Sequence, residues 1–64
     1  MNRVRRYALM ILQAHRDKFG VDFEANKRAL AQVASIPSKS LRNQVAGYIT
    51  ALLKREREQA EEEG

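Results

Sequence analysis

The fold is decided by the stretch from Ile36 to Arg55, which reads IPSKSLRNQVAGYITALLKR. Pro37 gives it a stiff start, and Ser38 is a candidate N-cap because its hydroxyl can accept a hydrogen bond from a free amide of the first turn. Apolar residues then recur at helical spacing and form one stripe: Leu41, Val45, Tyr48, Ile49, Leu52 and Leu53. We therefore expect one long helix that begins near Ser38 and turns this stripe toward the rest of the chain.

The opposite face of this helix places small side chains between basic and amide ones: Lys39, Asn43, Ala46, Gly47, Thr50 and Lys54. A glycine inside a helix costs roughly 1 kcal/mol relative to alanine, so Gly47 indicates that another group approaches the backbone there. That group is either an external ligand or a neighbouring helix in a tight crossing. Because Gly47 lies away from the apolar stripe, we favour the external ligand.

A first helix is expected from Arg3 to Lys18, with Asn2 as a possible N-cap and Gly20 as a left-handed C-cap. Its buried face follows from the spacing of Val4, Tyr7, Ala8, Ile11 and Leu12. Cations in the first turn oppose the helix dipole, which indicates selection for a partner rather than for stability. These cations are Arg3, Arg5 and Arg6, and the alternative is a solvated terminus without a role.

A second helix is expected to begin after Asp22, its candidate N-cap, and to end near Ala34 or Ser35. A polar cluster of Asn26, Lys27 and Arg28 lies near its start. Only Ser35, Ile36 and Pro37 separate the second helix from the third helix. So short a link forces an angled hairpin of the helix-turn-helix kind. The predicted fold is therefore all-α, a small three-helix orthogonal bundle with a helix-turn-helix-like hairpin and a frayed acidic C-terminal tail.

Charge divides the chain unevenly. Residues 1–55 hold 11 Lys and Arg against three acidic residues, whereas residues 56–64 hold one Arg against five Glu. We therefore expect one helical domain over residues 1–57 and an acidic, flexible tail over 58–64, since the acidic end places carboxylates at the unfavourable end of the dipole. The excess of positive charge in the domain indicates a polyanionic partner.

Composition excludes several classes of function. The chain has no cysteine and one histidine, and it offers no nucleophile with a base and no glycine-rich phosphate loop. We expect no catalytic residues, metal, cofactor or small-molecule substrate. No apolar run approaches the roughly 18 residues that cross a bilayer, so we expect no membrane association and a cytoplasmic location. We also expect a monomer in isolation.

A series of short motifs resembles a known family. The motifs are Asp22-Phe23, Asn26-Lys27-Arg28, Ile36-Pro37-Ser38-Lys39, Leu41-Arg42-Asn43, Ala46-Gly47-Tyr48 and Lys54-Arg55. In this order and spacing, from about Arg3 to Arg55, they resemble the e-type small-subunit ribosomal protein seventeen of archaea and eukaryotes, in its archaeal length. The resemblance implies a compact helical protein without catalytic activity that binds ribosomal RNA in the small subunit, beside neighbouring ribosomal proteins, and so supports translation on the cytoplasmic ribosome.

The residues themselves suggest how RNA would be held. Basic side chains approach phosphates and release counterions, and Asn43 and Thr50 can donate to phosphates, 2′-hydroxyls or base edges. Gly47 would let a phosphate or ribose reach the helix backbone. The candidate RNA-binding residues are Arg3, Arg5, Arg6, Asn26, Lys27, Arg28, Ser38, Lys39, Arg42, Asn43, Gly47, Thr50, Lys54 and Arg55. The aromatic residues Tyr7, Phe19, Phe23 and Tyr48 fall mostly on apolar faces, so base stacking is not expected.

The alternative is a helix-turn-helix DNA-binding transcriptional regulator, with the third helix in a major groove. Its outward face, however, has Ala46 and Gly47 at its centre, where a reader of base edges would use Arg, Asn or Gln. We therefore rank DNA binding second to RNA binding.

Overall fold

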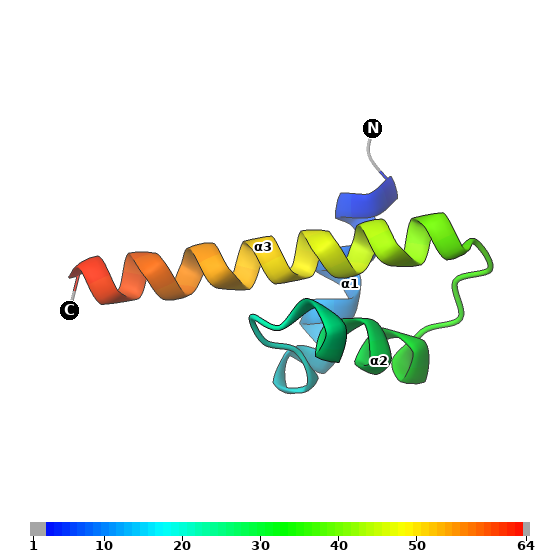
Figure 1. Ribbon diagram of the computed structural model, residues 1–64, viewed down its shortest axis with the longest axis horizontal. Coiled ribbons are helices and arrows are strands. Elements are labelled where there is room, and N and C mark those ends of the chain that lie inside the picture. The colour runs from blue at the N-terminus through cyan, green and yellow to red at the C-terminus, as the bar shows by residue number, and fades with distance from the viewer. Residues whose placement is uncertain (1–2, 64) are drawn as a thin grey trace.

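The computed structural model describes residues 3–63, with the side chains of residues 3–60. Its elements are α1 (Arg3–His15), the short 3₁₀ helix η1 (Arg16–Lys18), α2 (Phe23–Val33) and α3 (Lys39–Glu63). All regular structure over this range is helical (Figure 1). The predicted all-α class is therefore confirmed.

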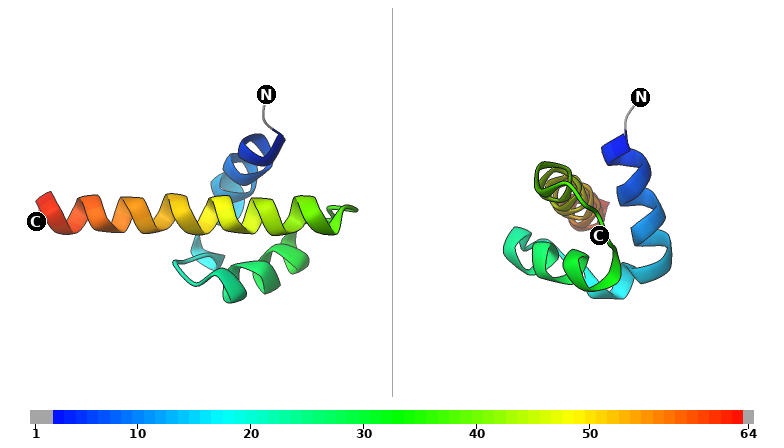
Figure 2. Two further views of the ribbon diagram at one scale, coloured as in Figure 1. Left: turned by 45° about the horizontal axis from the view of Figure 1, so that its top comes forward. Right: turned by 90° about the vertical axis from the view of Figure 1, so that its right-hand side faces the viewer.

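The long helix α3 is the element on which both others pack. Its 25 residues run along most of a molecule that measures 40 Å in its longest direction. Seen end-on, α1 and α2 cover two different sides of α3 and are joined to each other through η1 (Figure 2). This arrangement is the predicted orthogonal three-helix bundle, with α2 and α3 as its hairpin.

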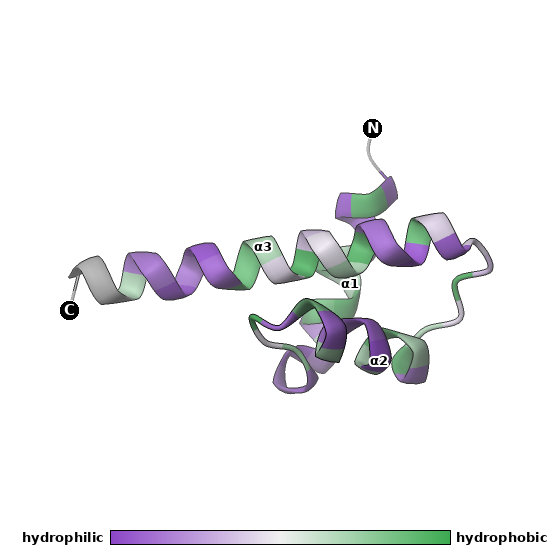
Figure 3. Cartoon of the chain, viewed as in Figure 1, coloured by the Kyte–Doolittle hydropathy of each residue, from purple (hydrophilic) through white to green (hydrophobic). Residues whose placement is uncertain are grey.

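The core draws on all three helices and on the link between α2 and α3. Its buried residues are Ala8, Ile11, Leu12, Leu30, Ile36, Val45, Ala46 and Ile49. The prediction that Ala46 faces outward is wrong, since the residue is 0% exposed. Because α1 and α2 lie on two sides of α3, the buried arc of α3 is wider than a single stripe. The part of α3 that crosses the other helices is accordingly the more hydrophobic part (Figure 3).

Two predicted N-caps are confirmed. Ser38 Oγ accepts from the amide of Leu41 at 3.2 Å, and α3 begins at the next residue. Asp22 Oδ1 accepts from the amides of Glu24 at 3.0 Å and Ala25 at 3.5 Å, and α2 begins directly after it. Each side chain satisfies amides that have no partner within the helix. The possible cap Asn2 lies outside the described residues.

The end of the first helix differs from the prediction. The α-helix ends at His15, the chain tightens into η1, and Phe19 is extended with φ −120° and ψ 155°. Neither described glycine has a positive φ, so the predicted left-handed C-cap at Gly20 is wrong. Both backbone polar groups of Gly20 instead bond to the side chain of Asn26, which fixes this turn from within the protein.

The C-terminal segment continues the helix. α3 runs without a break through position 58 to Glu63, so the predicted frayed tail is not confirmed. Arg16 Nη2 in η1 donates to Glu56 Oε1, which ties the turn after α1 to this part of α3. No helix within residues 3–63 combines the length and the hydropathy needed to span a bilayer.

Candidate nucleic-acid interface

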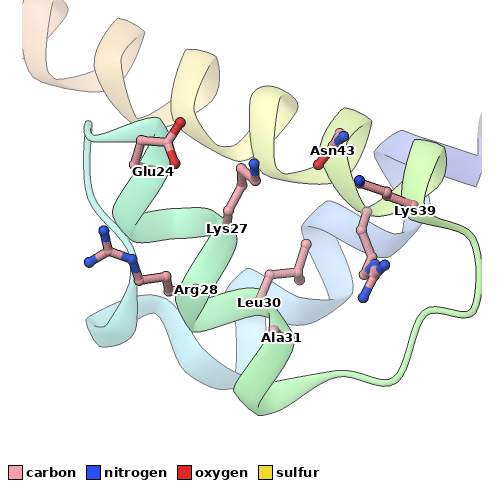
Figure 4. Close-up of a pocket in the computed structure, with 8 residues that line it drawn as sticks. Glu24, Lys27, Arg28, Leu30, Ala31, Lys39 and Asn43 are labelled. Atoms are coloured by element: carbon pink, nitrogen blue, oxygen red, sulfur yellow. The ribbon is translucent and has the colours of Figure 1, made fainter.

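An open groove lies between α2 and the first turns of α3 (Figure 4). Its volume is about 390 Å³, and it is lined by Glu24, Lys27, Arg28, Leu30, Ala31, Lys39, Arg42 and Asn43. Four of these residues are cationic and one is acidic. We call this feature the α2–α3 groove.

Helical spacing explains why these side chains meet. On α2, Lys27, Arg28 and Ala31 follow Glu24 by three, four and seven residues, so the four share one face. On α3, Arg42 and Asn43 follow Lys39 by three and four residues and share a face of the first turns. The hairpin turns the two faces toward each other, and the linker that contains the buried Ile36 holds them there.

The charge of the groove suits a polyanion. Lys39 is the first residue of α3, whose first turn contains no acidic residue. A cation at this end of a helix is unfavourable by roughly 0.3–1 kcal/mol, so Lys39 itself does not contribute to helix stability. Four cations around an open concavity raise the local concentration of anions. Lys39 and Asn43 are exposed, and Lys27 and Arg42 are half-buried.

Asn26, a predicted RNA contact, lies in the interior instead. It is 1% exposed, and its Nδ2 donates to the Gly20 carbonyl and to Thr50 Oγ1, both at 2.8 Å. Its Oδ1 accepts from the Gly20 amide at 2.9 Å. The amide is therefore engaged in three internal bonds. Asn26 therefore does not share a surface with Lys27 and Arg28 as predicted, because the spacing to Leu30 and Val33 places it on the inner face of α2.

The face of α3 that contains Gly47 and Thr50 is also not open. Thr50 Oγ1 donates to the Ala46 carbonyl at 2.8 Å and accepts from Asn26. A Cβ added at Gly47 would lie 3.8 Å from Cε1 of Phe23, which is ordinary van der Waals contact. The expected outward face is therefore wrong at both positions, and the contact is too loose for the alternative of a crossing that requires glycine.

The remaining candidates lie elsewhere on the molecule. Arg3, Arg5 and Arg6 lie at the start of α1, on the far side of α3 from α2 (Figure 1). Lys54 and Arg55 lie farther along α3 and line two separate shallow hollows. Ser38 caps α3. The structure thus brings together five of the predicted residues: Lys27, Arg28, Lys39, Arg42 and Asn43.

Two features of this surface were not predicted. Glu24 and Ala31 line the α2–α3 groove, and their spacing to Lys27 and Arg28 was the signal that could have identified them. Phe23 was expected in the core but is 36% exposed. Its position as the first residue of α2, directly after the cap, was the available signal, because a first-turn residue has less of the protein around it.

The fold also bears on the alternative of DNA reading. The middle of α3 is covered, since Val45, Ala46 and Ile49 are all 0% exposed. A recognition helix presents base-reading side chains along an open face, and these three positions are not available for that role. Fold and groove together define a small, cationic, all-α protein with a concave surface suited to a polyanion.

Comparison with known proteins narrows this class. The family model described as Ribosomal S17 matches residues 1–63. Small ribosomal subunit protein eS17 of Pyrobaculum islandicum is 54% identical over 52 residues, which cover 81% of this chain and 73% of that protein. The protein of the same name from Pyrobaculum arsenaticum is 47% identical over 60 residues, 94% of this chain and 84% of that protein.

A protein from another genus gives the same result. Small ribosomal subunit protein eS17 of Methanocaldococcus jannaschii is 51% identical over 47 residues, 73% of this chain and 76% of that protein. The chain therefore belongs to the Ribosomal S17 family, as its motifs predicted. This is a family of structural ribosomal proteins, not of enzymes.

Proposed function

We propose that the protein is a structural component of the small ribosomal subunit, where it binds and stabilises ribosomal RNA and so supports translation on the cytoplasmic ribosome. The observation that supports RNA binding most directly is the α2–α3 groove, where Lys27, Arg28, Lys39 and Arg42 surround an open concavity. Family membership supports the proposal that the protein is part of the small ribosomal subunit. Neighbouring ribosomal proteins are further partners in this proposal.

In this proposal the groove holds the RNA backbone. Lys27 and Lys39 act as point charges, whereas the planar guanidinium of Arg42 can donate two parallel hydrogen bonds to one phosphate. Asn43, exposed at the same edge, can donate to a phosphate or a 2′-hydroxyl. Much of the binding free energy comes from release of counterions as these cations replace them.

Positive charge outside the groove supplies secondary contacts in the same proposal. The arginines that open α1, together with Lys54 and Arg55, are positioned to meet other RNA segments around the domain. Four earlier candidates are removed from the set because their polar groups or positions serve the fold: Asn26, Ser38, Gly47 and Thr50.

Competition binding tests the proposal. Small-subunit ribosomal RNA and duplex DNA are compared as competitors for the labelled protein at one salt concentration, because the electrostatic part of both affinities depends on salt. We expect the ribosomal RNA to compete at the lower concentration. Stronger competition by duplex DNA would contradict the proposal and favour a DNA-binding regulator.

A pair of variants tests the site. Arg42→Gln removes a cation from the groove, whereas Arg6→Gln removes an exposed arginine on the far side of α3. We expect the first change to weaken RNA binding more than the second. Equal effects of the two changes would mean that the groove is not the principal contact.

A further inference from the structure

Phe23 differs from the other aromatic residues of the chain. Tyr7, Phe19 and Tyr48 pack against the core, whereas the ring of Phe23 lies outside it and the residue is 36% exposed. An exposed aromatic ring gives up part of the stability that its burial would contribute. The stability of the fold therefore does not explain why the Phe23 side chain is exposed.

The surroundings of the ring are cationic. Lys27 Nζ lies 5.6 Å from the ring centroid, within the range of a cation–π interaction. Lys27 also lines the α2–α3 groove. One lysine thus connects the ring with the proposed phosphate site, so a nucleotide whose phosphate is held by Lys27 has a base within reach of Phe23.

Position 47 of α3 lies beside the ring. A Cβ there would contact Phe23 Cε1 at 3.8 Å, and any longer side chain would compete for the space beside the ring. Gly47 is half-buried in the middle of α3, where glycine is unfavourable for the helix. A residue without a side chain at this position keeps bulky groups away from the ring.

We propose that Phe23 is a stacking site for one unpaired RNA base, adjacent to the α2–α3 groove and connected to it by Lys27. This inference rests on the proposed RNA binding and adds the form of RNA that is recognised. Proteins that read RNA by stacking take bases from loops, bulges and ends, where the base is not already stacked in a duplex. The groove would hold the backbone, and the ring would hold a base turned out from it.

Fluorescence can test stacking directly, because the chain contains no tryptophan. Phe23→Trp places a single indole at the proposed site, and Met10→Trp places one on α1 at a residue that is 57% exposed and lies outside the groove. On titration with small-subunit ribosomal RNA, we expect quenching of the Phe23→Trp emission and a much smaller change for Met10→Trp. Equal changes for both variants would overturn the inference.

Affinity gives the second measurement. Phe23→Leu keeps an apolar side chain but removes the ring, and Phe23→Tyr keeps the ring as the matched control. Base–aromatic stacking corresponds to about fivefold or more in affinity. We therefore expect Phe23→Leu to weaken binding to the same RNA by about that factor and Phe23→Tyr to bind like the unmodified protein.

The possible outcomes separate the two proposals. If the unmodified protein binds the RNA but Phe23→Leu binds equally well, the stacking inference fails and the proposed function stands. Weaker binding by Phe23→Leu without quenching of the Phe23→Trp emission also overturns stacking. If the unmodified protein does not bind the RNA, both proposals fail.

Discussion

Asn26 and Thr50 join α2 to α3 through a hydrogen bond of 2.8 Å from the amide Nδ2 to the hydroxyl Oγ1. The same Asn26 also bonds both backbone polar groups of Gly20, so one side chain connects the turn after η1, α2 and α3. Groups that the sequence suggested for RNA binding thereby fix the relative position of the two helices that form the groove.

We expect Asn26→Ala to lower the free energy of unfolding by about 2–4 kcal/mol, because it removes three internal hydrogen bonds of a buried side chain, each of which contributes about 0.5–1.5 kcal/mol. Denaturant titration followed by circular dichroism measures this change. Asn43→Ala is the matched control, since Asn43 is exposed, and it should change stability by less than about 0.5 kcal/mol. Similar losses for both variants would contradict the structural role of Asn26.

Gly47→Ala should stabilise the protein. The added methyl group would lie 3.8 Å from Phe23 Cε1, so it is accommodated without displacement of the ring. Replacing glycine by alanine inside a helix contributes up to about 1 kcal/mol. Thermal unfolding should show a higher Tm for the variant. A lower Tm would indicate that α2 approaches α3 more closely at this point than the structure shows.

Lys39→Glu should separate stability from binding. A carboxylate at the first position of α3 interacts favourably with the helix dipole, so the free energy of unfolding should rise by about 0.3–1 kcal/mol. The same change removes a cation from the groove and should weaken RNA binding. Melting and RNA-binding assays on one preparation test both effects. A variant that is more stable and binds RNA as before would show that Lys39 has no role in binding.

Arg16→Ala should have little effect on stability, although it removes the ion pair with Glu56. The two side chains are 59% and 44% exposed, and pairs this open to solvent contribute about 0–1 kcal/mol. Chemical denaturation at low and high salt provides the measurement. A loss well above 1 kcal/mol would mean that the turn at η1 depends on this pair for its position.

The helices and the N-caps of α2 and α3 were predictable because their signals are local. The periodicity of the apolar stripe, Asp22 and Ser38 each act within one or two turns, and all three predictions hold in the structure. The link after α2 was also informative, because a link of only a few residues permits a limited range of geometries between the two helices.

The surface of the bundle was less predictable, because it depends on where the third element packs. Viewed from α3 alone, Ala46, Gly47 and Thr50 lie opposite the apolar stripe and should face solvent. In the folded protein α2 covers that side, so Ala46 is buried and Thr50 bonds to Asn26. Small and amide side chains are compatible with either environment, whereas Lys39 is compatible only with solvent or an anionic partner.

The central claim, that the α2–α3 groove binds RNA phosphates, is tested most directly by the salt dependence of RNA affinity. The slope of log K against log salt is negative, and each phosphate contact that is lost makes it less steep by about one. Lys39→Gln and Lys18→Gln each remove one exposed lysine, the first at the groove and the second in η1. We predict a slope that is less steep by about one for Lys39→Gln and an unchanged slope for Lys18→Gln. Equal slopes for both variants and the unmodified protein would contradict the claim.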